Sequence, residues 1–252
     1  MMRTIAREAA DLVDNAQLAA IEDQARKQQE ELQIAARIQQ GLMAVQILDF
    51  LFAGVQAHSI ACRAVCGDFF DVISGEDVLN VALVDVSGKG ISGAILASTL
   101  QGLLHVQLEG GQTLDAIAPA TNRYLCLKAV VKYETILLPR LHQDGTLEYL
   151  NCGHVQPRLC SDSRVSRLEQ SNVPVGLLDG AEFTAGNVTL RPGCRVIQVS
   201  DGITEAEDAQ GEFFGDERLD SASLCGTFPA CSSGWLTSAR GIPPVTTAPL
   251  CR

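Results

Sequence analysis

The sequence predicts an α+β fold with antiparallel strands and a long N-terminal helix. Three strand candidates follow one another, at 135–138, 147–151 and 195–199, and this succession favours antiparallel pairing over a doubly wound parallel sheet. Asp144-Gly145 lies between the first two, which is a hairpin signal. The first 43 residues contain no proline and only one glycine, which indicates a helix.

Residues 1–43 are predicted to be a helical linker or dimerisation segment. Ile34, Ile38 and Leu42 repeat at a spacing of four, which places them in one apolar stripe. Such a stripe serves either to pair with a second helix or to pack against the helix's own domain. Both alternatives stay open at this point, and a homodimer through residues 1–43 is one expectation.

Residues 44–219 are predicted to form one domain of strands and helices. The apolar run at 79–84 is typical of a buried strand. Apolar residues recur through 91–109 and predict a largely buried helix there. These residues are Ile91, Ile95, Leu96, Leu100, Leu103 and Leu104.

Residues 220–252 are predicted to be an irregular tail. Ser, Thr, Gly, Pro, Ala and Cys dominate this segment, and it holds four of the nine prolines. Neither a helical nor a strand period is visible, which is typical of irregular structure.

Charge and cysteine usage exclude several classes of protein. The net charge of −11 disfavours binding to nucleic acid or to an anionic membrane surface. The nine cysteines include no CxxC pair, so we expect reduced thiols in the cytoplasm rather than disulfides or a zinc site. No run of eighteen apolar residues exists, so no membrane span is expected.

Three acidic motifs carry the chemistry that the sequence predicts. Asp85 and Asp201 each follow an apolar strand and precede small residues, and Asp68 stands in a third acidic motif. Carboxylates that converge from strand ends suit hard cations such as Mg²⁺ and Mn²⁺. Each Asp taken alone could instead form a turn or cap a helix. A nucleotide-binding loop at 85–90 is a further alternative, but the spacing of a P-loop is lacking.

Five motifs in this order resemble one protein family. They are CGDFFD at 66–71, DVSGKG at 85–90, NCGH at 151–154, PVGL at 174–177 and SDGITEA at 200–206. Together they resemble the SpoIIE/RsbU branch of the PPM-type metal-dependent protein serine/threonine phosphatases. The segment IAARIQQGL at 34–42 is similar to the linker helix that precedes this domain, and FFGDERL at 213–219 also fits. The resemblance covers roughly residues 30–219 and implies a four-layer α-β-β-α sandwich.

The resemblance also implies a site, a reaction and a substrate. Asp68 would bind one metal ion, Asp85 with the Val86 carbonyl would bridge two ions, and Asp201 would bind the other. Two Mn²⁺ or Mg²⁺ ions would activate a water that attacks phosphorus without a phosphoenzyme intermediate. The implied substrate is a phosphorylated regulatory protein of the anti-sigma-factor antagonist type.

The sequence departs from this family at its C-terminal end. The family usually closes with an Asp-Asp pair on a last strand, whereas Asp220 is the only acidic residue after Leu219. We therefore expect one metal ligand, the last helix and the last strand to be missing, with a sheet edge unpaired. The alternative function is a catalytically impaired regulatory or binding module. Lys89 could contact a substrate phosphate or be a solvated loop lysine, and His154 could donate a proton or be structural.

Overall fold

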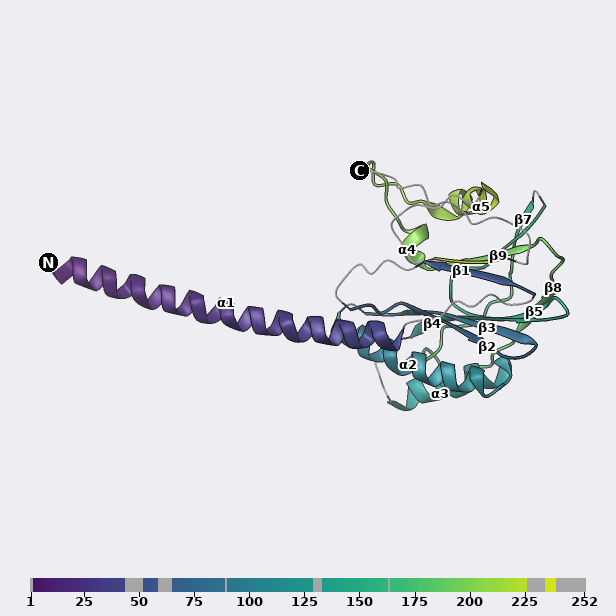
Figure 1. Ribbon diagram of the computed structural model, residues 1–252, viewed down its shortest axis with the longest axis horizontal. Helices are drawn as coiled ribbons and strands as arrows, with labels where there is room; N and C mark the ends of the chain where they lie inside the picture. The colour runs from purple at the N-terminus through teal and green to yellow at the C-terminus, as the bar shows by residue number, and fades with distance from the viewer. Residues whose placement is uncertain are drawn as a thin grey trace. The chain divides into compact units, whose positions relative to one another are not determined.

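The computed structural model describes residues 2–43, 52–58, 65–88, 90–128, 133–162, 164–225 and 234–238. The chain divides into two compact units, Met1–Leu42 and Met43–Arg252. The first unit is one long helix, and the second contains the sheets and the remaining helices (Figure 1).

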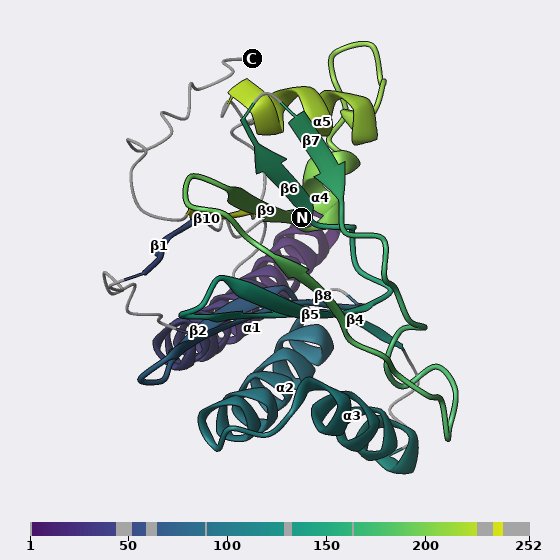
Figure 2. The ribbon, with the colours of Figure 1, turned by 90° about the vertical axis from the view of Figure 1, so that its right-hand side faces the viewer.

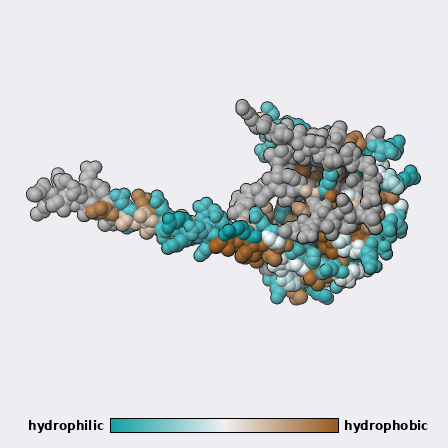
Figure 3. Space-filling view, in the orientation of Figure 1, coloured by the Kyte–Doolittle hydropathy of each residue, from teal (hydrophilic) through white to brown (hydrophobic). Residues whose placement is uncertain are grey.

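The first unit is helix α1, Met2–Leu42, as the residues of this segment predict. The stripe residues Ile34, Ile38 and Leu42 are 49%, 60% and 57% exposed. Hydrophobic colour gathers toward the C-terminal end of α1 in Figure 3, whereas the middle of the helix is hydrophilic. The predicted stripe is therefore an apolar surface that solvent reaches.

The second unit contains two five-stranded antiparallel sheets, which confirms the predicted pairing. The first sheet has the order β2 (Phe69–Ser74), β3 (Val78–Val86), β4 (Glu134–His142), β5 (Thr146–Cys152), β8 (Gly186–Thr189). The second has the order β1 (Gly54–His58), β10 (Gly234–Ser238), β9 (Arg195–Val199), β6 (Arg158–Ser161), β7 (Arg164–Arg167). The predicted hairpin joins β4 and β5, where Gly145 takes a φ of 88°.

Helices cover the outer faces of the two sheets, so the unit has four layers (Figure 2). Helices α2 (Ile91–Glu109) and α3 (Leu114–Lys128) lie on the first sheet. Helices α4 (Asp201–Thr204) and α5 (Gly215–Cys225) lie on the side of the second sheet. This is the α-β-β-α sandwich that the family resemblance implies.

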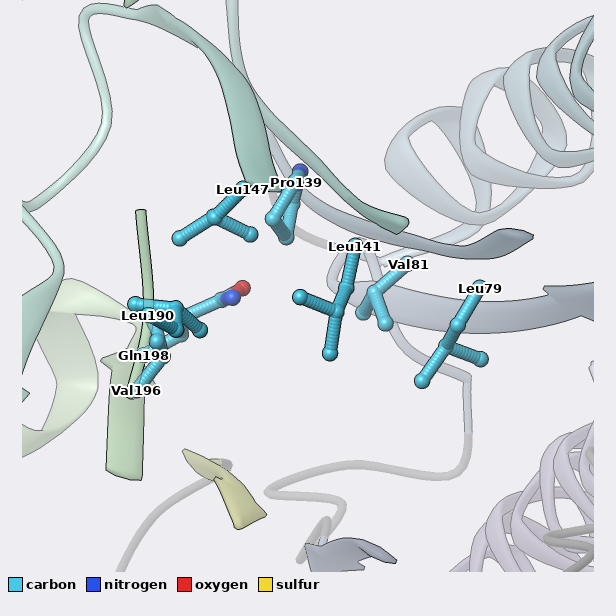
Figure 4. A pocket seen from close by; sticks show the side chains of 8 residues that line it. All are labelled: Leu79, Val81, Pro139, Leu141, Leu147, Leu190, Val196 and Gln198. Atoms are coloured by element: carbon cyan, nitrogen blue, oxygen red, sulfur yellow. The ribbon is translucent and has the colours of Figure 1, made fainter. Parts of the chain in front are cut away.

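Alternate residues of the strands fill two different cores. On β3, Val84 and Val86 face α2, while Leu79 and Leu83 face the second sheet. The core between the sheets leaves a cavity of about 10 Å³, hardly the space of one water (Figure 4). The side chain of Gln198 is the polar group in its lining.

Helix α2 has the predicted bounds but a different burial. Leu100 and Leu104 are buried, whereas Ile91 and Ile95 are 61% and 64% exposed, so the prediction that these two are buried is wrong. Small residues, not the isoleucines, face the sheet in the first turns of α2. Among the described helices, α2 alone is long and apolar enough to cross a membrane, and packing in the core accounts for that composition.

The C-terminal segment is more ordered than the sequence predicts. Helix α5 continues to Cys225, and β10 pairs with both β1 and β9. The predictions of an irregular segment, a missing last strand and an unpaired edge are wrong for these elements. Helix α5 begins inside the FFGDERL motif at 213–219, so the expectation that a further helix is missing after this motif falls on residues outside the described part of the chain and stays a prediction. Strand β10 is formed by pairing on both sides, a tertiary effect that a five-residue pattern does not reveal. Residues 226–233 and 239–252 lie outside the described part of the chain.

An ion-pair network attaches α5 to the second sheet. Arg158 on β6 is 1% exposed and donates to Asp216 and, at 2.8 Å, to Asp220. Arg167 on β7 pairs with the same two carboxylates. Asp220 is therefore engaged in holding a helix in place.

Candidate metal centre

Strand register brings two of the predicted carboxyls together. Asp85 is the next-to-last residue of β3, and Asp68 directly precedes β2. Phe69 pairs with Val84, so continuing this antiparallel register by one residue places Asp68 opposite Asp85. Directly opposed residues have Cβ atoms about 4.5–5.5 Å apart, so two like charges here repel each other.

The third carboxyl comes from the other sheet. Asp201 is the first residue of α4, two residues after the end of β9. The Asp85 carboxyl shares hydrogen bonds with both Asp68 and Asp201. The structure thus gathers the three predicted residues at one edge of the sandwich, with Asp85 between the other two.

Burial and mutual repulsion raise the pKa values of two of these carboxyls, Asp85 and Asp68. Burial raises the pKa of Asp85 to about 8, and the charges of Asp68 and Asp201 add to this effect. Burial also raises the pKa of Asp68, helped by the charge of Asp201, while the hydrogen bond from Asp85 opposes the rise. A nearby cation would oppose these rises in pKa, because it favours the ionised form of a carboxyl.

An oxygen-only group of three carboxyls and a nearby carbonyl fits Mg²⁺ or Mn²⁺ better than softer metals. Within the described ranges, however, no set of three or more His, Cys, Asp or Glu side chains is already arranged as a metal cage. Cation binding at Asp85 would therefore displace the proton that its raised pKa retains near pH 7.

The alternative roles in turns and caps find no support at Asp85 or Asp201. Helix α2 is preceded by Gly90 and has no side-chain hydrogen bond at its N-cap. Ser200, not Asp201, is the N-cap of α4, and it makes no side-chain cap bond either.

Glycines allow the loop after β3 to approach the first acidic motif. A Cβ at Gly67 would lie 3.0 Å from the Val86 carbonyl oxygen, and one at Gly93 would lie 2.7 Å from that of Gly88. Gly88 and Gly90 both have positive φ, at 120° and 83°. The Val86 carbonyl, a predicted ligand, thus lies directly against the residue before Asp68.

Glu134 is a residue of this region that the sequence reasoning missed. It is fully buried at the start of β4, and its carboxylate accepts a hydrogen bond from the backbone N–H of Ser87. The second carboxylate oxygen is 3.5 Å from the Ser87 hydroxyl oxygen. An acid before an apolar strand is a common pattern at a solvated strand end, so its sequence signal is weak.

His154 links the two sheets beneath the carboxyls. Its Nδ1 lies 2.8 Å from the Thr135 hydroxyl, and Thr135 is paired with Asp85. Burial lowers the pKa of His154 to about 4, so the ring is neutral near pH 7. Nε2 lies near the Val199 backbone but makes no well-formed hydrogen bond with any described residue. These contacts favour the structural role over the proton donor.

The other predicted residues lie elsewhere. Asp71, in the first motif, faces α2, where it accepts from Gln101 at 3.0 Å and contacts His105 Nδ1 at 2.7 Å. Asp220 is held by Arg158 and Arg167, and β10 contains no acidic residue. Lys89 lies outside the described residues.

Comparison with known proteins identifies the family of this chain. The model of the family "Stage II sporulation protein E (SpoIIE)" matches residues 75–229. The phosphoserine phosphatase RsbU of Bacillus subtilis (strain 168) is 24% identical over 185 residues, which cover 72% of this chain and 55% of RsbU. The chain spans about a third to about a half of the length of the curated relatives it matches.

Solved structures share the fold. The SiaA-PP2C domain of Pseudomonas aeruginosa has a TM-score of 0.67 at 17% identity, covering 86% of this chain and 98% of that domain. A crystal structure of RsbX in complex with magnesium has a TM-score of 0.57 at 16% identity, covering 77% of this chain and 98% of RsbX.

Proposed function

The chain belongs to the SpoIIE family, in the RsbU-like branch of the PP2C-type phosphatases, and from this premise we propose that it hydrolyses phosphoserine or phosphothreonine on a regulatory protein. The observation that carries the proposal is the meeting of Asp68, Asp85 and Asp201 at one edge of the sandwich. In this proposal Asp68, Asp85 and Asp201 would hold Mn²⁺ or Mg²⁺, with Asp85 as the central ligand because it lies between the other two carboxyls.

The chain's own groups would prepare this site for a phosphoryl group. Divalent cations, when bound, supply charge neutralisation and an acidified water. Asp68 and Asp201 approach from different sheets, so the stacking of the sheets sets their separation. His154 holds the two strand ends in register by contacting Thr135 on one sheet and lying beside Val199 on the other. A neutral His154 adds no charge there.

The finer proposal concerns partners. We propose a phosphorylated anti-sigma-factor antagonist as the substrate, as the family resemblance implies, and the name of the relative RsbU, a phosphoserine phosphatase, supports phosphoserine as the target group. We also propose a cytoplasmic location, which the absence of a CxxC pair among the nine cysteines supports. We also propose a homodimer through residues 1–43, which the exposed stripe of Ile34, Ile38 and Leu42 supports. The net charge of −11 gives no support to a nucleic-acid or membrane partner.

A second candidate is a regulatory or binding module of the same fold that hydrolyses nothing. Two observations favour it: Asp220 is engaged by arginines, and β10 offers no acid where the family's last strand carries one. This module would bind at most one cation tightly.

Phosphate release from a phosphoserine protein tests the enzyme, and a calorimetric Mn²⁺ titration separates the two candidates. The enzyme requires added Mn²⁺ or Mg²⁺ and two tight sites. Turnover in excess chelator contradicts the metal-dependent mechanism, whereas one site without turnover favours the binding module.

A further inference from the structure

Glu134 lies behind the metal centre, on the other face of the first sheet. It pairs with Val86 across the strands, and its neighbour Thr135 pairs with Asp85. Side chains of one cross-strand pair lie on the same face, and Val86 belongs to the core under α2. Asp85 points away from that core, so the Glu134 carboxylate does not share its face.

Two hydrogen bonds to Val175 hold the backbone of Glu134. Its N–H donates to the Val175 carbonyl at 2.9 Å, and its carbonyl accepts from the Val175 N–H at 3.0 Å. The side chain reaches from this fixed point to the Ser87 N–H and hydroxyl. A hydrogen bond from a backbone N–H to a carboxylate is stronger than one between neutral groups.

That contact sets the direction of the Val86 carbonyl. The N–H of Ser87 and the C=O of Val86 belong to one peptide unit, which is planar and trans, so they point in opposite directions. The N–H points at Glu134, and the carbonyl oxygen therefore points away from it, toward Gly67 beside Asp68. The peptide unit is held between an acid on one side and the first acidic motif on the other.

We infer that Glu134 is a positioning residue that aims the Val86 carbonyl into the metal centre, an inference that rests on the proposed function. Without Glu134, the loop from Ser87 to Gly90 would lose a buried anchor next to two glycines of positive φ. The peptide could then rotate, and the carbonyl would turn away from the cation.

Two substitutions separate the reach of this side chain from its charge. Glu134→Gln keeps the length and an acceptor oxygen for the Ser87 N–H but removes the charge. Glu134→Asp keeps the charge but is one methylene too short. We expect Glu134→Gln to bind Mn²⁺ within about threefold of the wild type, and Glu134→Asp to bind at least about tenfold more weakly, as is usual for groups that orient a metal ligand.

The assay is a calorimetric Mn²⁺ titration of the full chain, with thermal melts in the presence and absence of Mn²⁺. Asn80→Ala is the matched control. Asn80 is a buried polar residue of the same strand as Asp85 and accepts from Arg140 Nε at 2.6 Å. Its loss should lower the melting temperature of the metal-free protein and leave Mn²⁺ affinity unchanged.

The Mn²⁺ affinities of the two variants test the positioning role of Glu134. Weak binding by Glu134→Gln with normal binding by Glu134→Asp overturns positioning and indicates a role for the charge. Normal binding by both variants reduces Glu134 to a folding role. If the wild type binds no Mn²⁺, the proposed function itself fails. If the wild type and both variants bind Mn²⁺ equally well, only the inference about Glu134 is refuted.

Discussion

Asp85→Asn is the sharpest test of the carboxyl cluster. Asparagine keeps the size of the side chain but cannot carry the charge that would hold two cations. In the metal-free protein Asp85 is crowded by Asp68 and Asp201, and its pKa is raised to about 8. The same substitution should therefore stabilise the metal-free protein and abolish its response to metal.

The expected magnitudes follow from the pKa and from linkage. A raised carboxyl pKa means that the folded state holds a proton which the unfolded state has released, so its contribution to stability is present below about pH 4 and is lost as the pH rises toward 8. The full difference would correspond to about 5 kcal/mol at pH 7.5, and partial exposure and shared charge reduce it to about 2 kcal/mol. For a domain of this size, that is a rise of about 4–8 °C in melting temperature for Asp85→Asn.

The stabilisation that bound Mn²⁺ provides depends on the Asp85 carboxylate, so the substitution that stabilises the metal-free protein should weaken this second effect. Mn²⁺ at 100 times its dissociation constant stabilises a protein by about 2.7 kcal/mol, or about 5–10 °C here. Asp85→Asn should lose most of this rise, and its turnover should fall to background. Asp68→Asn, which removes a ligand of one ion, should lose less.

Thermal melts at pH 7.5, with and without Mn²⁺, measure both effects. Asp144→Asn is the control, because Asp144 accepts the Thr146 N–H at 2.8 Å in the β4–β5 turn and lies in no acidic cluster. If Asp85→Asn lowers the metal-free melting temperature and keeps the full rise with Mn²⁺, then Asp85 is a turn residue and the cluster does not bind metal.

Three other parts of the chain give further predictions. Burial lowers the pKa of His154 to about 4, so the free energy of unfolding should fall by about 3 kcal/mol as the pH drops from about 6.5 to about 4. In urea unfolding, His154→Gln should not show this dependence on pH. Arg158→Met should lower the free energy of unfolding by about 3 kcal/mol, because Arg158 is the buried cation that holds α5. Arg167→Met should lower it by less than about 1 kcal/mol, and equal losses in denaturant unfolding would contradict this account. Removal of residues 1–43 should convert a dimer into a monomer in light scattering, and a full chain that already has the mass of a monomer would count against the proposed dimer.

The positions of Asp85 and Asp201 were predictable from local features of the sequence. Asp85 and Asp201 each follow an apolar run, and a strand end places a side chain at a definite edge of a sheet. The long helix α1 was equally plain, since nothing in its sequence interrupts it. Strand ends and uninterrupted helices are local features, and local features are what a single sequence records.

The features that the sequence did not reveal depend on distant partners. Glu134 has the pattern of an ordinary acid at a strand end, and its role depends on Ser87, 47 residues earlier. Ile91 and Ile95 have the pattern of core residues, yet the close approach at Gly93 gives the sheet-facing positions to small residues. Strand β10 has a composition like that of the residues around it, and it becomes a strand because it pairs with β1 and β9.

The place of β10 also sets the order in which the domain can be completed. The residues of β1 are synthesised early, at 54–58. Its partner strand β10 is complete only when residue 238 has been synthesised. At about 5–20 residues per second, β1 waits at least about nine seconds for its neighbour. The first sheet and its two helices can close during that time, so the second sheet must be the late half of the domain. A chain that ended before β10 would leave both β1 and β9 with open backbone edges, and such edges invite pairing between molecules.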